Sequence, residues 1–237
     1  MSAFKKSLSA LGVCAALVIS AQSFAATDAT IAVTGTIVPS ACSPTLSNSG
    51  EVSFGTIAAS SIRAAQSGNT LVQLGAKDIT LTISCDASTA VGFTARDNRS
   101  SSAVALSSES YIDSVMAGEN GVKSELYGFG LGNASNNAKI GAYSLFVDAA
   151  NVTADGKPAA SIYSEDKKTW IKSDTVTRMS NTGSMTTTLS NTGTITPVLF
   201  KEGIFPLKIA AAVQTSSVLG FDEINLDGSV TLSMVYL

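Results

Sequence analysis

Short runs in which apolar and polar residues alternate recur along the chain, separated by clusters of Gly, Ser, Asn and Asp. Alternation with a period of two places one face of a β-strand on a core and the other in solvent, and helical periodicity is almost absent. The clearest runs predict strands over 31–38, 71–74, 79–85, 91–95, 140–147, 194–200, 204–213 and 224–237. Shorter strands are predicted near 52–57, 126–131, 161–163 and 170–171. This pattern is typical of an all-β sandwich or barrel.

Two polar stretches interrupt the strands. Residues 96–120 predict a loop with one brief helical turn. Residues 180–194 contain two similar pieces, Ser180-Asn181-Thr182-Gly183-Ser184 and Ser190-Asn191-Thr192-Gly193-Thr194, which predict two turns at the ends of a strand over 185–189. Neither stretch is long or charged enough to link two independent domains. We therefore expect one domain with long decorated loops.

The first residues predict export. Lys5 and Lys6 precede an apolar run over 11–19. After this run comes a small-x-small cleavage site, Ser23-Phe24-Ala25. The run is well short of the roughly 20 apolar residues that span a bilayer, which disfavours a membrane anchor. We predict a signal peptide over 1–25, with Ala26 as the next candidate for its last residue, and passage through the periplasm.

Charge and composition narrow the function classes. The 15 Lys and Arg residues include Lys5 and Lys6, so the mature chain keeps 13 against 18 acidic residues. This net negative charge makes nucleic acid an unexpected partner. There is no histidine, the residue that acid–base catalysis uses most often. We therefore expect no catalytic residues, no cofactor and no metal.

Sequence motifs for enzymes are equally weak. No Gly-x-Ser-x-Gly elbow or phosphate-binding loop occurs in a fitting context. Gly128-x-Gly130-x-Gly132 is not followed by a predicted helix, so its glycines are expected to serve turns and close strand approach. A calcium site has no support, because the candidate carboxylates are scattered at Asp97, Asp113, Asp148 and Asp155.

Two cysteines, Cys42 and Cys85, remain once Cys14 leaves with the signal peptide. In an oxidising compartment they are expected to pair. Without histidine they do not complete a zinc site. The predicted disulfide would stabilise the fold by about 3 to 5 kcal/mol through the loop that it closes.

Both ends of the mature chain carry a strand pattern with one apolar face. At the start, Ala29, Ile31 and Val33 alternate with polar or small residues. At the end, one face carries Val230, Leu232, Met234 and Tyr236, and the strand runs to Leu237. Chain ends usually fray, so we expect these strands to be ordered by pairing with something.

Several features follow one another in a particular order along the chain. They are a short N-terminal extension, Val33-x-Gly35-x-Ile37-x-x-x-Ala41-Cys42, Phe54-Gly55-Thr56-Ile57, Cys85 closing a strand, and Val230-x-Leu232-x-Met234-x-Tyr236-Leu237 with its penultimate tyrosine. In this order of features the sequence resembles the pilins of bacterial chaperone–usher fimbriae. The resemblance is strongest over 26–95 and 195–237. In the centre, Asp97-Asn98-Arg99, Tyr127-Gly128-Phe129-Gly130-Leu131-Gly132 and Ile140-Gly141-Ala142-Tyr143 look like a less studied proteobacterial branch.

The resemblance implies an immunoglobulin-like β-sandwich over 34–237 that lacks its final strand. The extension 26–33, with Ala29, Ile31 and Val33, would be a donor strand that completes a neighbouring subunit, as in donor-strand complementation. The terminal strand, Val230 to Leu237, would form the edge that a periplasmic chaperone grips. Partners would then be that chaperone, an outer-membrane usher and neighbouring subunits of a cell-surface fimbrium that supports adhesion or biofilm formation.

Other interpretations remain open. In one alternative, the sandwich is complete by itself, and both terminal strands pair with strands of the same chain. A minor or tip subunit would bind a host or abiotic surface, with a stacking face built from Trp170, Tyr163, Tyr127 and Phe129. Taken singly, each of these aromatic residues fits a core or cross-strand position better. A periplasmic pilin-like protein that never polymerises is a further alternative.

Overall fold

A computed structural model of the protein describes residues 30–36, 40–113, 120–220 and 222–237. The predicted signal peptide, 1–25, and Ala29 lie outside the described residues. The chain divides into two units, Met1–Val38 and Pro39–Leu237, and the second holds every helix and strand described below.

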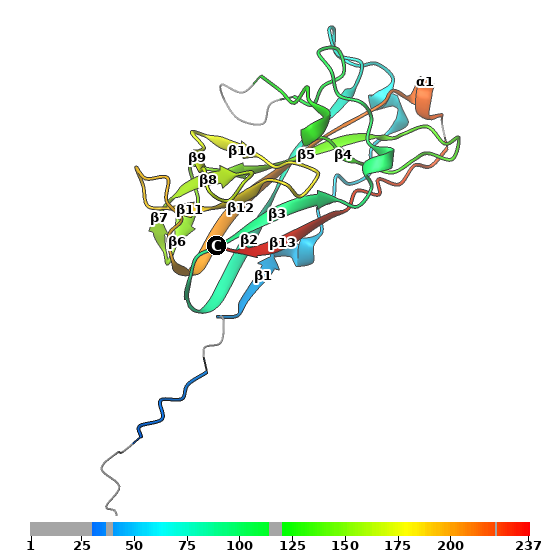
Figure 1. Ribbon diagram of the computed structural model, residues 1–237. Coiled ribbons are helices and arrows are strands. Elements are labelled where there is room, and N and C mark those ends of the chain that lie inside the picture. Colours follow the sequence, from blue (N-terminus) through cyan, green and yellow to red (C-terminus); the bar gives the residue numbers. More distant parts are fainter. Residues whose placement is uncertain (1–29, 37–39, 114–119, 221) are drawn as a thin grey trace, which may run out of the picture. The chain divides into compact units, whose positions relative to one another are not determined.

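The unit Pro39–Leu237 is built from two antiparallel sheets (Figure 1). The main path of the first sheet runs β1 (Cys42–Leu46), β2 (Val72–Thr89), β12 (Phe200–Val213), β5 (Gly141–Asp148) and β10 (Val176–Arg178). Short strands extend it: β4 (Phe129–Gly130), β6 (Thr153–Ala154) and β7 (Lys157–Pro158). The second sheet runs β13 (Val230–Tyr236), β3 (Val91–Asp97), β11 (Thr186–Ser190), β8 (Ala160–Ser164) and β9 (Ile171–Lys172).

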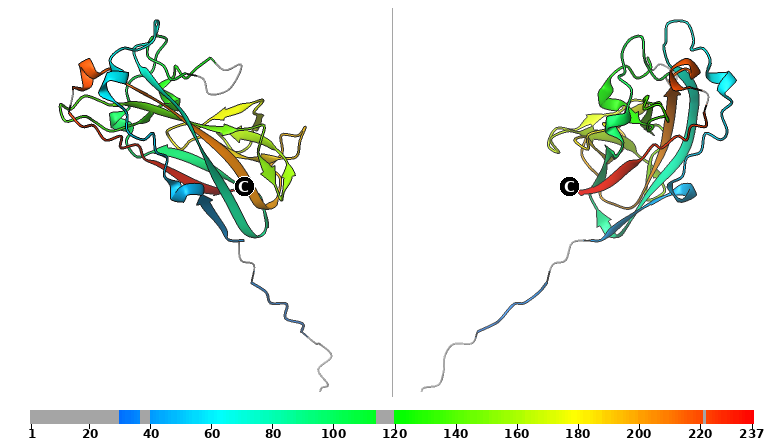
Figure 2. Two further views of the ribbon diagram at one scale, coloured as in Figure 1. Left: turned by 180° about the vertical axis from the view of Figure 1, so that it is seen from behind. Right: turned by 90° about the vertical axis from the view of Figure 1, so that its right-hand side faces the viewer.

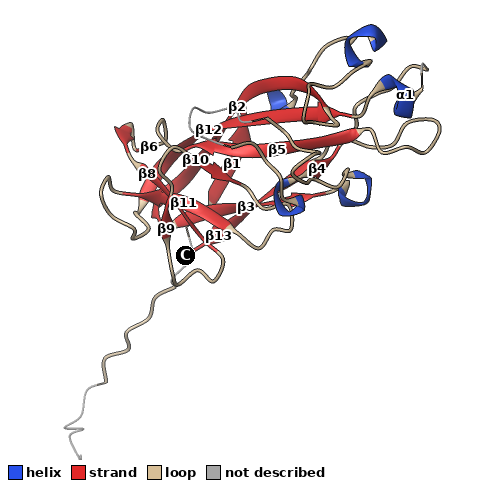
Figure 3. Cartoon of the chain, turned by 90° about the horizontal axis from the view of Figure 1, so that it is seen from above, coloured by secondary structure: helices blue, strands red, loops and turns tan. Residues whose placement is uncertain are grey.

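Among the residues of this unit that the structure describes, helical structure is confined to single turns within loops (Figure 3). These are α1 (Ser216–Leu219) and the 3₁₀ turns η1 (Ser47–Gly50), η2 (Ala59–Ile62), η3 (Ser100–Ser102) and η4 (Glu125–Tyr127). No helix among the described residues is long and apolar enough to cross a membrane. The predicted all-β sandwich is confirmed.

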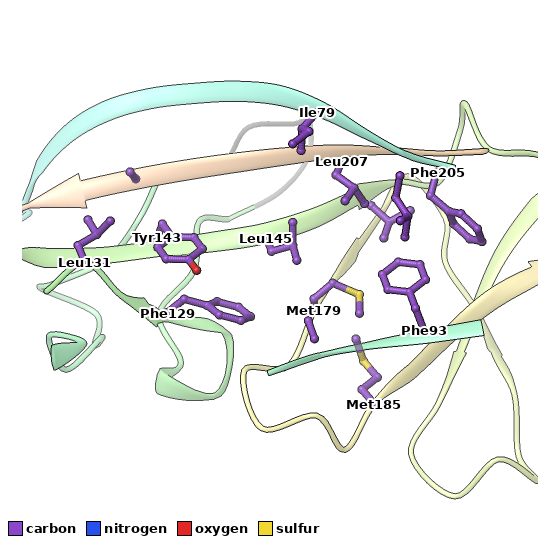
Figure 4. Packing of buried hydrophobic residues seen from close by; sticks show 14 of the residues in the cluster. Ile79, Phe93, Phe129, Leu131, Tyr143, Leu145, Met179, Met185, Phe205 and Leu207 are labelled. Carbon is purple, nitrogen blue, oxygen red and sulfur yellow. The ribbon is translucent and has the colours of Figure 1, made fainter. Parts of the chain in front are cut away.

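The core lies between the two sheets (Figure 4). Phe93 of β3 meets Phe205 of β12 edge to face, with ring centroids 5.1 Å apart, which packs the two sheets against each other. Towards one end, Phe129 stacks on Tyr143 with centroids 5.2 Å apart. Alternation explains this packing, because successive side chains of a strand point to opposite faces.

Several predicted strands are confirmed, with shifted ends. The predictions over 91–95, 140–147, 185–189 and 204–213 correspond to β3, β5, β11 and β12. The predictions 71–74 and 79–85 are parts of one strand, because β2 continues through Gly75 and pairs with β12 along its length. The helical turn predicted in the loop 96–120 is present as η3.

Other predictions were wrong. Residues 52–57, 224–229 and the described part of 31–38 alternate in sequence but form no strand, because they make no ladder with a neighbouring strand. The prediction 194–200 was wrong except at Phe200. The prediction 126–131 is confirmed only at β4, Phe129–Gly130, because its first residues belong to the turn η4. Strand β1 was missed, because Cys42-Ser43-Pro44-Thr45-Leu46 has the composition of a turn.

The disulfide predicted between Cys42 and Cys85 is present, with a sequence separation of 43. It joins β1 to β2 at a directly opposed pair whose Cα atoms are 4.0 Å apart. Among the described strands, β2 is the one ladder partner of β1.

Replacing Cys42 and Cys85 together by alanine should lower the free energy of unfolding by about 4 kcal/mol, because the open chain gains the entropy that the closed loop forbids. Urea unfolding of the oxidised proteins measures the difference. Reductant should lower the midpoint of the wild type to that of the double variant and leave the variant unchanged. Equal midpoints in oxidising buffer would contradict the stabilising role.

Candidate functional site

Strands β1 and β13 end the two sheets. Each has one ladder partner among the described strands, β2 for β1 and β3 for β13, and presents its other edge open. An open edge carries main-chain N–H and C=O groups that another strand can bind. The site is therefore built from main-chain groups as much as from side chains.

The ladder between β13 and β3 fixes which groups face outward. Asn98 N–H donates to Ser229 O at 3.0 Å, and Leu237 N–H donates to Ala90 O at 3.0 Å. In an antiparallel pair, residues that exchange hydrogen bonds alternate with residues that do not. The main-chain groups of the intervening even-numbered residues consequently point to the open side of β13: Val230, Leu232, Met234 and Tyr236.

The same argument orients β1. Asp86 N–H donates to Ala41 O at 3.0 Å, so Cys42, opposite Cys85, belongs to the pairs that do not exchange hydrogen bonds. The N–H of Cys42 therefore points away from β2. Pro44 has the same orientation and lacks an N–H, a common arrangement on an edge strand.

The core-facing apolar side chains on and next to β1 and β13 are only half-buried. Leu232 and Met234 lie opposite Ala95 and Phe93, which are fully buried, so they face the core, yet they keep partial exposure. Similar half-buried side chains follow β1 and precede β13, packing on the same core. We call this set the apolar seam: Leu46, Val52, Phe54, Ile57, Ile224, Leu226, Val230, Leu232 and Met234.

The seam is bounded by contacts at both ends. At one end, the N–H of Cys42 donates to the hydroxyl of Tyr236 at 3.0 Å, which joins β1 to β13. Figure 2 shows the backbone of β1 in blue and that of β13 in red from two further sides. At the other end, η2 contacts α1. The stretch from β1 to η2 therefore runs antiparallel to the stretch from α1 to β13, with the apolar seam between them.

The turn after β3 holds the start of β13. The side-chain amide of Asn98 donates to the hydroxyls of Ser229 and Thr231, both at 3.0 Å, and its carbonyl accepts from the Thr231 hydroxyl at 3.1 Å. With the main-chain bond from Asn98 to Ser229, these contacts set where β13 begins.

Arg99 adds an ion pair to the same segment. Its guanidinium binds both carboxylate oxygens of Asp227, at 2.8 and 3.2 Å. The hydrogen bond with Arg99 lowers the pKa of the Asp227 carboxyl. This contribution to stability is therefore complete above the ordinary aspartate pKa of about 3.9 and is lost as the pH falls through the lowered value. Both side chains are well exposed, so the contribution is small.

The central glycine-rich motif packs behind this turn. The buried carboxylate of Asp97 accepts the N–H groups of Arg99 and Gly130, both at 2.8 Å. A Cβ at Gly130 would lie 2.2 Å from Arg99 O, so only glycine permits this approach. The close approach predicted for this motif is confirmed at Gly130, where the neighbour is the turn after β3. Burial, and then the charge of Asp97, raise the pKa of the Tyr143 phenol.

One of the aromatic candidates belongs to the core, and the acidic candidates form no metal site among the described residues. Phe129 is fully buried against Tyr143, so it belongs to the core and not to an exposed stacking face. Trp170, Tyr163 and Tyr127 are half-buried. Within the described ranges, no group of three or more Cys, Asp or Glu side chains is arranged to hold a metal ion.

The described part of the N-terminal segment, 30–36, forms no helix or strand. Ile31 and Val33, two of the three predicted donor residues, are 86% and 93% exposed. Their side chains are thus available to another molecule.

Two features escaped the sequence-based prediction. The contacts of Asn98 with Ser229 and Thr231 join residues more than 130 positions apart, and the Cys42–Tyr236 bond spans 194. The motif Asp97-Asn98-Arg99 is visible in the sequence, but nothing in the local pattern identifies its partners.

Replacing Asn98 by alanine should loosen the start of β13, because three side-chain hydrogen bonds are lost. Hydrogen exchange at the Thr231 and Ser233 amides should accelerate by about fivefold, because the three exposed bonds together contribute about as much as one typical hydrogen bond. Asn225→Ala, at an exposed position in the preceding segment, is the matched control. Unchanged exchange in Asn98→Ala would contradict the holding role of the turn.

Comparison with known proteins places the chain in a family. Residues 31–144 match the family described as Protein of unknown function (DUF1120). Protein GltF of Escherichia coli strain K12 is 37% identical over 252 residues, covering 99% of each chain. Uncharacterized protein YhcF of the same strain is 31% identical over 232 residues, covering 90% of this chain and 92% of its own. With this identity over nearly its whole length, the chain belongs to the same protein family as GltF and YhcF.

Proposed function

We propose that the chain is a pilin-like structural subunit of a chaperone–usher surface fibre, assembled head to tail by donor-strand exchange. The observation that carries the proposal is the open edge of β13, where outward main-chain groups lie above half-buried apolar side chains. The descriptions of the family and of its two relatives state no activity, ligand or partner. The proposal therefore depends on this chain's own edges.

An added strand would bind both the outward main-chain groups of β13 and the side chains of the apolar seam. Its main chain would pair with the outward groups of β13, and its alternate side chains would cover the half-buried apolar row. Left open, such an edge promotes aggregation, so an exported subunit needs a partner to cover it. We assign that first role to a periplasmic chaperone, before an outer-membrane usher delivers the subunit to the fibre.

The N-terminal extension of a second copy is the proposed permanent occupant. Ile31 and Val33 are spaced by two residues, so in a strand both would face the seam while Thr30 and Thr34 face solvent. Burying each of these apolar side chains would contribute about 1.5–3 kcal/mol. The predicted third residue, Ala29, would add a smaller apolar contact in the same register.

The geometry of this contact favours a fibre. The extension and the seam are different surfaces of one chain, so each copy would donate one and offer the other. Heterologous contacts that do not close produce an open assembly. The fibre would lie on the cell surface and support adhesion or biofilm formation.

A minor or tip subunit with a surface-binding face has less support. The proposed stacking face would lose Phe129 to the core, and the remaining aromatic side chains are half-buried. We propose a structural role in preference to catalysis, since the site consists of strand edges and apolar side chains.

Replacing Ile31 and Val33 by aspartate should abolish fibres, because two charges would have to enter an apolar seam. The subunit should still be exported and bound by its chaperone, because its own seam is unchanged. Electron microscopy of cells, with quantification of sheared surface protein, measures the outcome.

The control, Thr34→Asp with Thr36→Asp, adds the same charge to the opposite face of the alternating run 31–38 and should keep fibres. Fibres that persist unchanged in the Ile31/Val33 variant would exclude the donor-strand role. Absence of fibres even in the wild type, with a chaperone and usher present, would favour a pilin-like protein that does not polymerise.

A further inference from the structure

We propose that the hydroxyl of Tyr236 is a latch across the seam, holding the outward N–H of Cys42 until a carbonyl of an incoming strand replaces it. The inference rests on the proposed function, since it names how strand addition at the same site is controlled. It is carried by the 3.0 Å bond from Cys42 N to the Tyr236 Oη.

The Cys42 N–H is the kind of group that an added strand would bind. It points away from β2, as the hydrogen bond of the adjacent pair, Asp86 N–H to Ala41 O, requires. Pro44, the next residue with this orientation, has no N–H to offer. The N–H of Cys42 is therefore the outward donor nearest the end of the seam that Tyr236 occupies.

The hydrogen bond between Tyr236 and Cys42 can break by a rotation of the Tyr236 side chain alone. Tyr236 is 51% exposed, and its main chain lies opposite Val91 on β3, so the ring can turn without breaking the β13 ladder. Ring rotation changes side-chain torsions only, and the phenol would exchange its protein partner for water. The Cys42–Cys85 disulfide fixes the other side of the bond, so the phenol is the part that moves.

The latch also links the two sheets in the absence of an added strand. Strand β1 has β2 as its one ladder partner among the described strands, and β13 likewise has β3. The phenol bond joins these edges directly, which limits their separation. Strand addition would replace this single contact by main-chain pairing. The added strand, in place of the phenol, would then link β1 to β13.

The test uses the full exported chain carrying Ile31→Asp and Val33→Asp, which accepts a strand and does not donate one. In this background Tyr236→Phe removes the hydroxyl and keeps the ring. The probe is a synthetic peptide of residues 26–38 with the native sequence. Tyr163→Phe, at a half-buried tyrosine in β8, is the matched control.

Two readouts are expected to change together. Without peptide, amide exchange at Cys42 should be about fivefold faster in Tyr236→Phe, as the loss of one hydrogen bond predicts. The peptide should associate faster with Tyr236→Phe, because no latch has to open. Once peptide is bound, the Cys42 amide should be protected equally in both proteins.

Each other outcome is decisive. Equal Cys42 exchange in the two free proteins would overturn the latch. Peptide binding with the same rate and affinity to both would also overturn it, while leaving strand addition intact. Failure of the peptide to bind either protein would overturn both the latch and the proposed function. The Tyr163→Phe control should match the parent in both readouts, and a change of equal size there would overturn the assignment to Tyr236.

Discussion

The account of this protein depends on the open edge of β13, where main-chain groups have no ladder partner among the described strands. Its inner neighbour, β3, is fully buried at Phe93 and Ala95, whereas Met234 and Leu232, which lie opposite them, are only half-buried. Main-chain groups on the outer side of β13 add hydrogen-bonding capacity to this apolar row. The edge therefore combines the two features that strand addition uses, main-chain pairing for affinity and side-chain contacts for register.

The surrounding structure holds that edge in place without covering it. Asn98 and Arg99 attach the segment before β13 to the end of β3, and Asp97 with Gly130 packs the turn against the core. On the opposite side, the disulfide fixes β1 to β2. The hydroxyl of Tyr236 then spans the two edges. A rigid edge loses little conformational entropy when a strand is added, which favours tight binding.

The sequence predicts the features of this edge that depend on neighbouring residues, and it does not predict contacts between residues far apart in the chain. Alternation identified the core-facing row of β13 and the long strands, because the side-chain period is local. It failed at 52–57 and 224–229, where the apolar spacing is that of a strand but no ladder forms. It missed β1, whose Pro44 suits an edge but resembles a turn. The contacts of Asn98 and Tyr236 join residues far apart in sequence, so no local pattern predicts them.

The central claim is that the sandwich is completed by an added strand, and thermal unfolding tests it most directly. Residues 26–38 would be fused after Leu237 through a flexible linker, in the full chain carrying Ile31→Asp and Val33→Asp. The account predicts a rise in Tm of about 10 °C or more, as several kcal/mol of burial implies for a domain of this size. A fused segment that carries the same two aspartates should give no rise. An unchanged Tm with the native segment would mean that the domain is already complete, which would contradict the account.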